Sequence, residues 1–174
     1  LVSRALGCKP YYRPSVLDAT AGMGRDSLIM ALLGCQVTMQ ERNPAIYLLL
    51  ENALARFKIS PHYQTIAGSL SLDFADSLEE DEKSAVAKQQ HDVIYLDPMF
   101  PERKKSALVK KEMRLFKLLA GEDFDADLLL ENAMQKALKR VVVKRPKGAP
   151  VLAGKKPSHE IVAKKFRYDV YLKS

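Results

Sequence analysis

Short runs of apolar and β-branched residues alternate along the chain with longer segments that show helical periodicity. This alternation is typical of an α/β fold with a parallel sheet. The strands that it predicts are residues 16–20, 36–41, 63–67, 91–97, 140–144 and 166–172, the last of them near an edge of the sheet. The helices that it predicts are residues 26–33, 44–57, 106–120 and 125–138. Residues 70–90 are predicted to form an acidic loop with a short helix, and residues 146–157 a basic loop.

The length of 174 residues suits one domain, so we expect residues 1–174 to form a single doubly wound unit. The chain opens without Met and in the middle of a predicted helix, so we expect an N-terminal part to be missing. The first six residues lack the plan of a signal peptide, and no apolar run approaches the roughly 18 residues of a membrane span. We therefore expect a cytoplasmic protein with no membrane partner.

The cysteines and histidines do not indicate a metal site. Cys8 and Cys35 are the only cysteines and have no metal-ligand spacing, and the three histidines are scattered. Two reduced thiols are the ordinary state of such cysteines in a cytosolic protein. We expect no metal.

The formal net charge of +7 is concentrated in the second part of the chain. Residues 1–101 hold 9 Lys and Arg against 12 Asp and Glu, whereas residues 102–174 hold 19 against 9. A basic half beside a near-neutral half favours a face that binds a polyanion, with a solvated lysine-rich surface as the alternative.

A glycine-containing turn follows the first predicted strand, in the segment Asp18-Ala19-Thr20-Ala21-Gly22-Met23-Gly24-Arg25-Asp26. Glycine lets the backbone approach a ligand closely, and ligands of such folds sit beyond the carboxyl ends of the strands. Ser27 stands where the dinucleotide fingerprint has its third glycine, which argues against a dehydrogenase. The Asp18 carboxylate would repel a diphosphate but attract an ammonium group. These features favour S-adenosylmethionine, which has an amino-acid end and no phosphate; a purely structural turn is the alternative.

Further cofactor contacts are predicted at the ends of the second and third strands. Glu41 can accept hydrogen bonds from the two vicinal hydroxyls of a ribose, or be an ordinary surface residue. Arg42 can pack on the adenosine or pair with a nearby acid. After the third predicted strand, the small residues Gly68 and Ser69 let an adenine approach the backbone, and the Ser69 hydroxyl can bond to it.

The fourth predicted strand ends in Asp97-Pro98-Met99-Phe100-Pro101, a motif that suits methylation of an exocyclic amine on a base. Such an amine is a poor nucleophile because its lone pair is delocalised into the ring. The Asp97 side chain and the Pro98 carbonyl can accept both amine hydrogens and direct the lone pair at a methyl group, while Phe100 stacks on the base. Prolines stiffen the loop, so positioning supplies most of the catalysis without a metal. Alone, the motif could equally be a proline turn with Phe100 in the core.

Basic residues follow this motif and recur at the end of the fifth predicted strand. The first pair is Lys104 and Lys105, and the second is Lys144 and Arg145. Because the ends of the fourth and fifth strands of a doubly wound sheet lie side by side, we expect all four residues to rim one pocket and to contact RNA phosphates.

Five segments of the chain resemble a bacterial family of 16S ribosomal RNA guanine-N2 methyltransferases, known as RsmJ and once as YhiQ. They are residues 18–26, 41–44, 95–101, 104–114 and 140–146. The run from Tyr95 to Arg114 is highly specific, and Met99 is usual in this family where the wider class has a second proline. The resemblance covers nearly the whole chain.

The resemblance implies a class I Rossmann-like methyltransferase domain that uses S-adenosylmethionine. The implied reaction is methyl transfer to the N2 amine of one guanosine in small-subunit ribosomal RNA, free or within a 30S particle. The implied cofactor contacts are Arg25, Asp26, Glu41, Arg42, Gly68, Ser69 and Asp97. With Asp18 and Gly22 from the turn, they complete the predicted cofactor site. Gly68 replaces the commoner Ser of the family, whose N-terminal region before the first strand is absent here.

Two other functions remain open. An amino methyltransferase that acts on adenine or cytosine in DNA or other RNA would use the same chemistry at Asp97. A non-catalytic RNA-binding factor of ribosome assembly could keep the fold as a relic, although intact Glu41, Asp97 and Phe100 argue against it.

Overall fold

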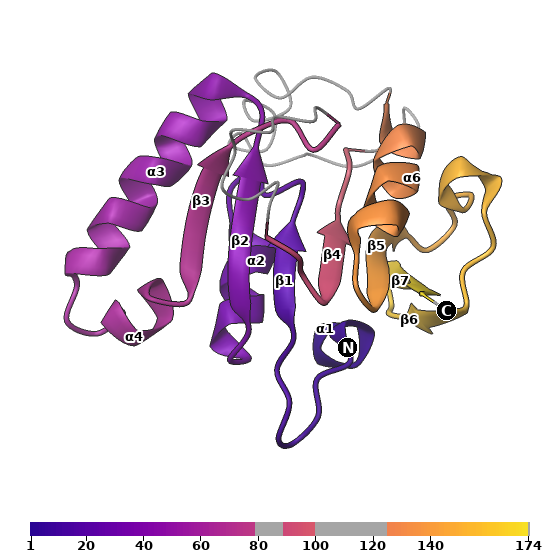
Figure 1. Cartoon of the computed structure of the whole chain (residues 1–174), viewed down its shortest axis with the longest axis horizontal. Coiled ribbons are helices and arrows are strands. Elements are labelled where there is room, and N and C mark those ends of the chain that lie inside the picture. The colour runs from indigo at the N-terminus through magenta and orange to yellow at the C-terminus, as the bar shows by residue number, and fades with distance from the viewer. Residues whose placement is uncertain (79–88, 100–124, 174) are drawn as a thin grey trace.

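A seven-stranded sheet forms the centre of the computed structural model, which describes residues 1–78, 89–99 and 125–173 (Figure 1). Its strands are β1 (Ser15–Asp18), β2 (Gln36–Glu41), β3 (Leu70–Phe74), β4 (Val93–Leu96), β5 (Arg140–Pro146), β6 (His159–Val162) and β7 (Phe166–Leu172). The helices are α1 (Val2–Leu6), α2 (Arg25–Leu32), α3 (Pro44–Ile59), α4 (Gln64–Ala67) and α6 (Ala126–Lys136), with a short 3-10 helix, η1, at Leu152–Gly154.

The strands lie in the order β3-β2-β1-β4-β5-β7-β6. The first five strands in this order, β3, β2, β1, β4 and β5, pair in parallel. Strand β7 lies between β5 and β6 and is antiparallel to both. From β1 the chain fills the sheet in one direction as far as β3, and then crosses to the other side of β1 with β4. The strand order therefore reverses between β1 and β4. Ligands of open α/β sheets bind at such a point, beyond the carboxyl ends of the strands.

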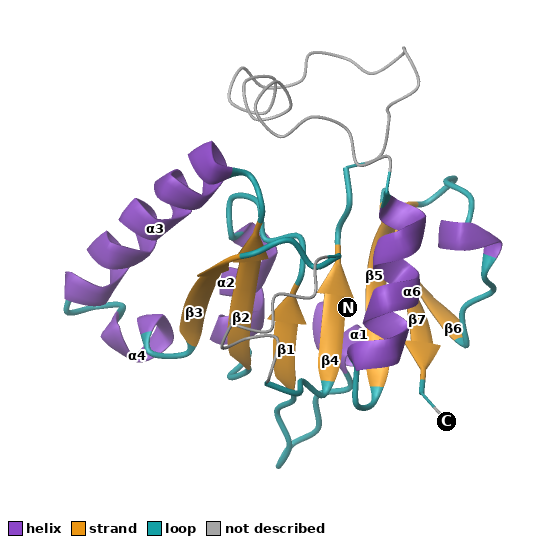
Figure 2. Cartoon of the chain, turned by 45° about the horizontal axis from the view of Figure 1, so that its top comes forward, coloured by secondary structure: helices purple, strands orange, loops and turns teal. Residues whose placement is uncertain are grey.

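Helices cover both faces of the sheet, with α6 on one face and α1 and α2 on the other (Figure 2). Successive strand residues point to opposite faces, so Val16 and Tyr95 belong to one buried cluster and Leu17 and Leu96 to the other. The first cluster contains buried residues of α1, α2 and α3, and the second contains those of α6. Burial on both faces explains why β4 is a continuous apolar run.

The predicted α/β class and the mostly parallel doubly wound sheet are confirmed by the structure. The start of α3 follows its sequence signal closely. The Asn43 side chain accepts hydrogen bonds from the backbone N–H groups of Ala45 and Ile46, and Pro44 occupies the first helical position. Two capped N–H groups leave few unsatisfied donors at this end of the helix.

One predicted strand is wrong. Residues 63–67 include helix α4, and the third strand is the next run of period two, Leu70–Phe74, inside the segment predicted to be a loop. Leu70 pairs with Val37 of β2 and is buried, which a loop would not achieve. The sequence pattern also does not predict β6, which is the edge strand. Strand β7 is second from that edge, as expected for a strand near an edge of the sheet. The predicted helix 106–120 lies outside the described residues.

Three simpler expectations can be compared with the described part of the chain. Cys8 and Cys35 are free thiols. No helix within residues 1–78, 89–99 and 125–173 is long and apolar enough to cross a membrane. Within the same ranges, no group of three or more His, Cys, Asp or Glu side chains could hold a metal ion.

Candidate active site

The predicted site lies where β1 and β4 end side by side. The backbone N–H of Ala19 donates to the carbonyl of Tyr95 at 3.1 Å, and the N–H of Asp97 donates to the Thr20 hydroxyl at 2.7 Å. These two bonds join the turn after β1 to the motif after β4. The turn and the motif, predicted separately as cofactor and catalytic segments, therefore form one edge of the sheet.

The turn after β1 needs its glycines. Gly22 and Gly24 have φ values of 53° and 68°, a region that other residues rarely adopt. A Cβ on Gly24 would also lie 2.8 Å from a methyl group of Leu50. The turn thus passes close to α3 before α2 begins, and Arg25 and Asp26 form the first turn of α2.

Asp18 is buried at the end of β1. Its carboxylate accepts hydrogen bonds from the backbone N–H of Thr20, at 3.3 Å, and from the Ser27 hydroxyl. Burial raises the pKa of Asp18 to about 7, although these two hydrogen bonds favour the charged form, and the charges of Asp26 and Asp97 raise it further. Asp18 therefore titrates in the physiological range.

Glu41, at the end of β2, binds the chain's own backbone. Its Oε2 accepts from the N–H of Gly22 at 3.0 Å and its Oε1 from the N–H of Asn43 at 2.8 Å. A carboxylate has about four acceptor positions, so a residue of this kind can bind backbone N–H groups and also accept from ribose hydroxyls. The same bonds fix the orientation of the carboxylate relative to the glycine turn.

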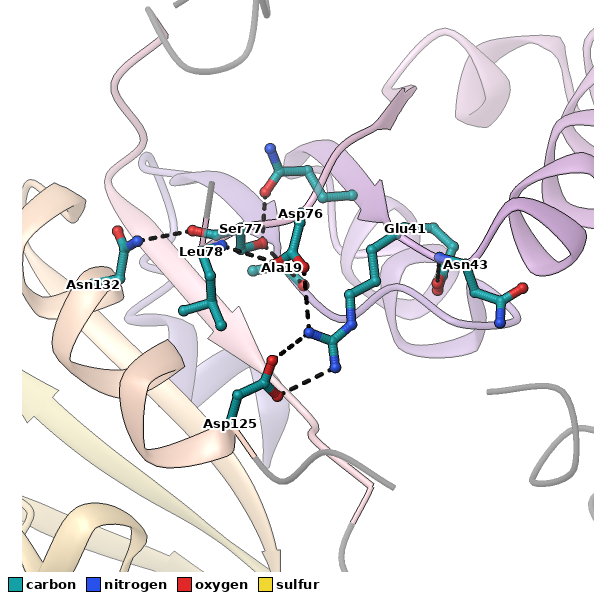
Figure 3. A network of polar contacts seen from close by, with 10 residues as sticks. Ala19, Glu41, Asn43, Asp76, Ser77, Leu78, Asp125 and Asn132 are labelled. Carbon is teal, nitrogen blue, oxygen red and sulfur yellow. Dashed lines mark hydrogen bonds and ion pairs between the residues drawn. The ribbon is translucent and has the colours of Figure 1, made fainter. Parts of the chain in front are cut away.

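Arg42 is held in ion pairs by two acids, Asp76 and Asp125, both of which are labelled in Figure 3. Its Nη1 lies 2.5 Å from Oδ2 of Asp125 and 3.4 Å from Oδ2 of Asp76. The pKa of Asp125 is lowered by its hydrogen bond with Arg42. Arg42 therefore connects the end of β2 with the turn after β3 and with the start of α6, which fits the predicted pairing with a nearby acid.

The corrected third strand moves the predicted adenine contacts. Gly68 and Ser69 precede β3, and the Ser69 carbonyl accepts from the N–H of Val37 near the start of β2, at the opposite edge of the sheet from Glu41. The strand pattern therefore does not support their assignment to the cofactor, which stays a prediction from the family resemblance. The residues that follow β3 at the correct edge are Asp76 and Ser77.

Asp76 and Ser77 form an ordered turn that sequence reasoning missed (Figure 3). The Ser77 hydroxyl donates to the Ala19 carbonyl at 3.2 Å and to the Gln40 side chain at 2.8 Å. Asp76 accepts from the backbone N–H of Leu78 at 3.0 Å. The alternation of Leu70, Leu72 and Phe74 with polar residues was the signal that could have found this turn.

Asp97 follows β4 and its side chain is 41% exposed. Its Oδ2 lies 2.9 Å from Nζ of Lys144, which also lies 2.7 Å from Oδ2 of Asp26. Pro98 is buried beside Asp97, and Phe100 lies outside the described residues. The edge thus brings together Asp26 and Asp97, which the sequence predicted as separate contacts, and adds Lys144 between them.

The two described residues that were predicted to bind RNA are engaged inside the protein. Lys144 is paired with Asp26 and Asp97, and Arg145 is only 3% exposed and donates to the Pro150 carbonyl at 2.9 Å. Strand alternation explains this outcome, because both faces of β5 are covered. The Lys144 side chain is 25% exposed, and its ion pairs and the burial of Arg145 give neither residue an open position for a phosphate, so their RNA contacts stay a prediction from the sequence. Lys104 and Lys105 lie outside the described residues.

The carboxylate side chains at this edge of the sheet suit a cationic ligand better than a phosphate. Carboxylates end or follow four neighbouring strands; they belong to Asp18, Glu41, Asp76 and Asp97. The cations Arg42 and Lys144 are already bound to carboxylates. S-adenosylmethionine carries an ammonium and a sulfonium group and a ribose diol, all of which carboxylates bind well.

The fold and this edge define the class of S-adenosylmethionine-dependent methyltransferases. Residues 1–173 match the family model described as "Putative SAM-dependent methyltransferase". A crystal structure of a SAM-dependent methyltransferase from Neisseria gonorrhoeae is similar, with a TM-score of 0.78 and 37% identity over 98% of this chain and 69% of that one. The rRNA methyltransferase AviRa from Streptomyces viridochromogenes, 17% identical, shares the fold with a TM-score of 0.62 over 98% of this chain and 81% of its own.

The chain belongs to the family of ribosomal RNA small subunit methyltransferase J, which confirms the resemblance seen in the sequence. Relatives of that name are 51% identical in Colwellia psychrerythraea, over 99% of this chain, and 49% identical in Nitrosococcus oceani, over 98% of it. These alignments cover 62% and 67% of the two relatives. The chain thus spans about two thirds of the length of the curated relatives it matches.

Proposed function

We propose that the protein transfers the methyl group of S-adenosylmethionine to the exocyclic N2 amine of a guanosine in small-subunit ribosomal RNA. The observation that carries the proposal is the acidic edge at the reversal of strand order, where Asp97 stands beside the glycine turn. The names of the relatives support ribosomal RNA as the substrate class. A cytoplasmic location, and a free RNA or a 30S particle as partner, are parts of the same proposal.

The cofactor would be held by residues from three strand ends, from the glycine turn and from the start of α2. The Glu41 carboxylate would accept the ribose hydroxyls, and the turn at Asp76 and Ser77 would border the adenine. Asp18, Asp26 and the backbone at Gly22 would face the amino-acid end. Bound S-adenosylmethionine would supply a methyl group on a sulfonium, which leaves as a neutral thioether without a metal.

The chain's own contribution to the reaction is the position of the amine. An Asp97 oxygen and the Pro98 carbonyl would accept the two N2 hydrogens and turn the nitrogen lone pair towards the methyl carbon. As the new C–N bond forms, the C–S bond breaks and one N2 proton is lost to solvent. Exposure of the Asp97 side chain permits such access.

The choice of guanine rests on the family resemblance, because adenine N6 and cytosine N4 amines would suit the same acceptors. The deciding experiment incubates the purified protein with S-adenosylmethionine and small-subunit RNA or 30S particles, and identifies the product by nucleoside mass spectrometry. We expect N2-methylguanosine. A methylated adenine or cytosine would favour the second enzyme function. If calorimetry detects no binding of S-adenosylmethionine, both methyltransferase functions are overturned and a non-catalytic RNA-binding factor is favoured.

We propose that RNA phosphates are bound by Lys147, Lys164 and Lys165. All three are exposed, and the N–H of Lys147 donates to the carbonyl of Lys165. Because Pro146 pairs with Phe166, the end of β5 and the turn before β7 lie at the same edge as Asp97. These lysines are more exposed than Lys144 and Arg145, whose RNA contacts stay predictions from the sequence. Lys104 and Lys105 stay proposed contacts from the sequence.

Changing Lys147, Lys164 and Lys165 together to Met should weaken RNA binding and reduce its dependence on salt. Each phosphate contact that is lost lowers the slope of log affinity against log salt by about 0.7–0.9. The measurement is a fluorescence-anisotropy titration at several salt concentrations. Lys155 and Lys156 form the matched control, because the Lys155 carbonyl accepts from Tyr171, which pairs with Val141 at the far end of β5. Equal slopes in both variants would contradict the proposed surface.

Affinity for S-adenosylmethionine should rise by up to about tenfold between about pH 6 and pH 8. The folded pKa of Asp18 is raised to about 7, so a bound cation favours ionisation and its binding releases a proton. Calorimetry in two buffers of different ionisation enthalpy measures both the affinity and the proton release. Asp18→Asn should remove most of the dependence, and a pH-independent affinity of the unchanged protein would show that Asp18 does not face the cofactor.

A further inference from the structure

Lys144 lies between two carboxylates from different parts of the fold. Leu96 pairs with Val143, so the next residues stand level, with Asp97 directly after β4 and Lys144 within β5. The Lys144 ammonium lies 2.9 Å from Asp97 and 2.7 Å from Asp26. Lys144 therefore joins the motif after β4 to the first turn of α2.

The contacts around this ammonium group restrict it from several sides. The Tyr95 hydroxyl donates to the same Asp26 oxygen at 2.6 Å, and Lys144 Nζ lies 5.8 Å from the centre of the Phe166 ring. The Lys144 side chain is only 25% exposed. Burial alone would lower the pKa of Lys144, but the Asp97 charge and the hydrogen bonds to Asp26 and Asp97 outweigh it and raise the pKa above its ordinary value. Lys144 is therefore charged throughout the physiological range.

We propose that Lys144 is a positioning residue for methyl transfer, which holds the Asp97 carboxylate in place by bridging it to Asp26, whose carboxylate also accepts from the Tyr95 hydroxyl. The proposal rests on the proposed function of Asp97 as an amine acceptor. Lys144 touches neither substrate nor cofactor in this role, and it acts through Asp97.

The physical argument concerns orientation and repulsion. Asp97 lies beyond the last ladder position of β4, so strand pairing does not fix its side chain. An acceptor that is misplaced by about 1 Å can cost a hundredfold in rate. Asp26 and Asp97 also repel each other when both are ionised, and the ammonium between them removes that repulsion. Lys144 thus keeps the acceptor charged and directed.

Within residues 1–78, 89–99 and 125–173, four titratable groups interact with the charges of this cluster. They are Asp18 on β1, Asp26 on α2, Tyr95 on β4 and Tyr168 on β7. All four are carboxylic acids or phenols, whose charged forms are negative, and Lys144 is the cation among these described groups. Removal of its charge would therefore move protonation of the Asp97 carboxylate to higher pH.

The test compares Lys144→Met and Lys144→Arg with Lys139→Met. Lys139 forms the same kind of ion pair, 2.9 Å from Asp92, at the opposite end of the same two strands. Each variant is measured for kcat, KM for RNA and the pH dependence of kcat, and the Asp97 carboxyl is titrated by carbon-detected NMR. If Lys144→Met does not fold, Lys144→Gln, which keeps a donor without charge, replaces it.

For Lys144→Met we expect kcat to fall about tenfold or more, with KM for RNA within about twofold. The acid limb of kcat and the Asp97 titration should both move to higher pH. Lys144→Arg should restore most of kcat and bring both pH dependences back towards those of the unchanged protein. Lys139→Met should have the same kcat and the same pH dependences as the unchanged protein. An increased KM with a reduced salt slope, at unchanged kcat and unchanged titration, would make Lys144 an RNA contact and overturn the inference.

The NMR titration separates this inference from the proposed function. If the unchanged protein transfers no methyl group, the proposed methyltransferase function fails. The Asp97 titration should still move to higher pH in Lys144→Met. An Asp97 titration that is the same with Lys144 and with Met at this position overturns the inference whether or not the protein is active.

Discussion

Replacement of Asp97 by alanine is expected to reduce methyl transfer by about a hundredfold or more while leaving the fold intact. The change removes the proposed side-chain acceptor of the amine hydrogens. The backbone N–H of residue 97 would still donate to Thr20, and Lys144 would still bind Asp26, so the edge keeps its structure. Single-turnover transfer from labelled S-adenosylmethionine into RNA measures the effect.

Asp97→Asn is the informative companion variant. It keeps one carbonyl oxygen as an acceptor but loses the charge that pairs with Lys144, so its rate should lie between those of the alanine variant and the unchanged protein. Thermal melting by circular dichroism checks that both variants fold. An alanine variant with full activity would remove Asp97 from the reaction and, with it, the role proposed for Lys144.

Asp169→Ala should lower the free energy of unfolding by about 3–5 kcal/mol, because it leaves a buried arginine without its counter-charge. Asp169 is fully buried, and its carboxylate lies 2.6 Å from Nε and 3.0 Å from Nη2 of Arg167. Arg167 also donates to the carbonyls of Lys147 and Ala149, at 2.9 and 2.8 Å. The loss should therefore also loosen the loop after β5.

Thermal unfolding tests this prediction, with an expected fall in Tm of about 10 °C. Glu160→Gln is the matched control, because Glu160 lies 3.8 Å from Arg167 Nε and is 42% exposed. Exposed pairs contribute about 1 kcal/mol or less, so this variant should melt near the unchanged protein. Similar losses in the two variants would contradict the assigned importance of burial.

The sequence predicts the fold best where a local signal and burial agree. Asn43 and Pro44 mark the start of α3, and the apolar run of β4 needs both faces of the sheet to be covered. The run at residues 63–67 has the composition of a strand but not the pairing. Leu70 and Leu72 lie in register with Val37 and Met39, and this partnership decides which of two similar runs becomes β3.

The candidate site is predicted from sequence only in part, for a related reason. Asp18, Glu41 and Asp97 follow from strand ends, which the pattern reveals. The pairing of Lys144 with Asp26 and Asp97 depends on how β5, α2 and β4 meet in space. The sequence alone does not distinguish a lysine that is exposed to solvent from one that forms an ion pair. Asp76 and Ser77 were missed because the strand before them was misplaced.

The register of β4 against β5 sets the position of Lys144 relative to Asp97. Each residue advances a strand by about 3.3 Å and turns the next side chain to the other face. An insertion of one residue between Arg140 and Lys144 would rotate the ammonium away from Asp97, and an insertion of two would carry it about 7 Å past that carboxylate. The number of residues between Arg140 and Lys144 is therefore set by the distance from the Lys144 ammonium to the Asp97 carboxylate.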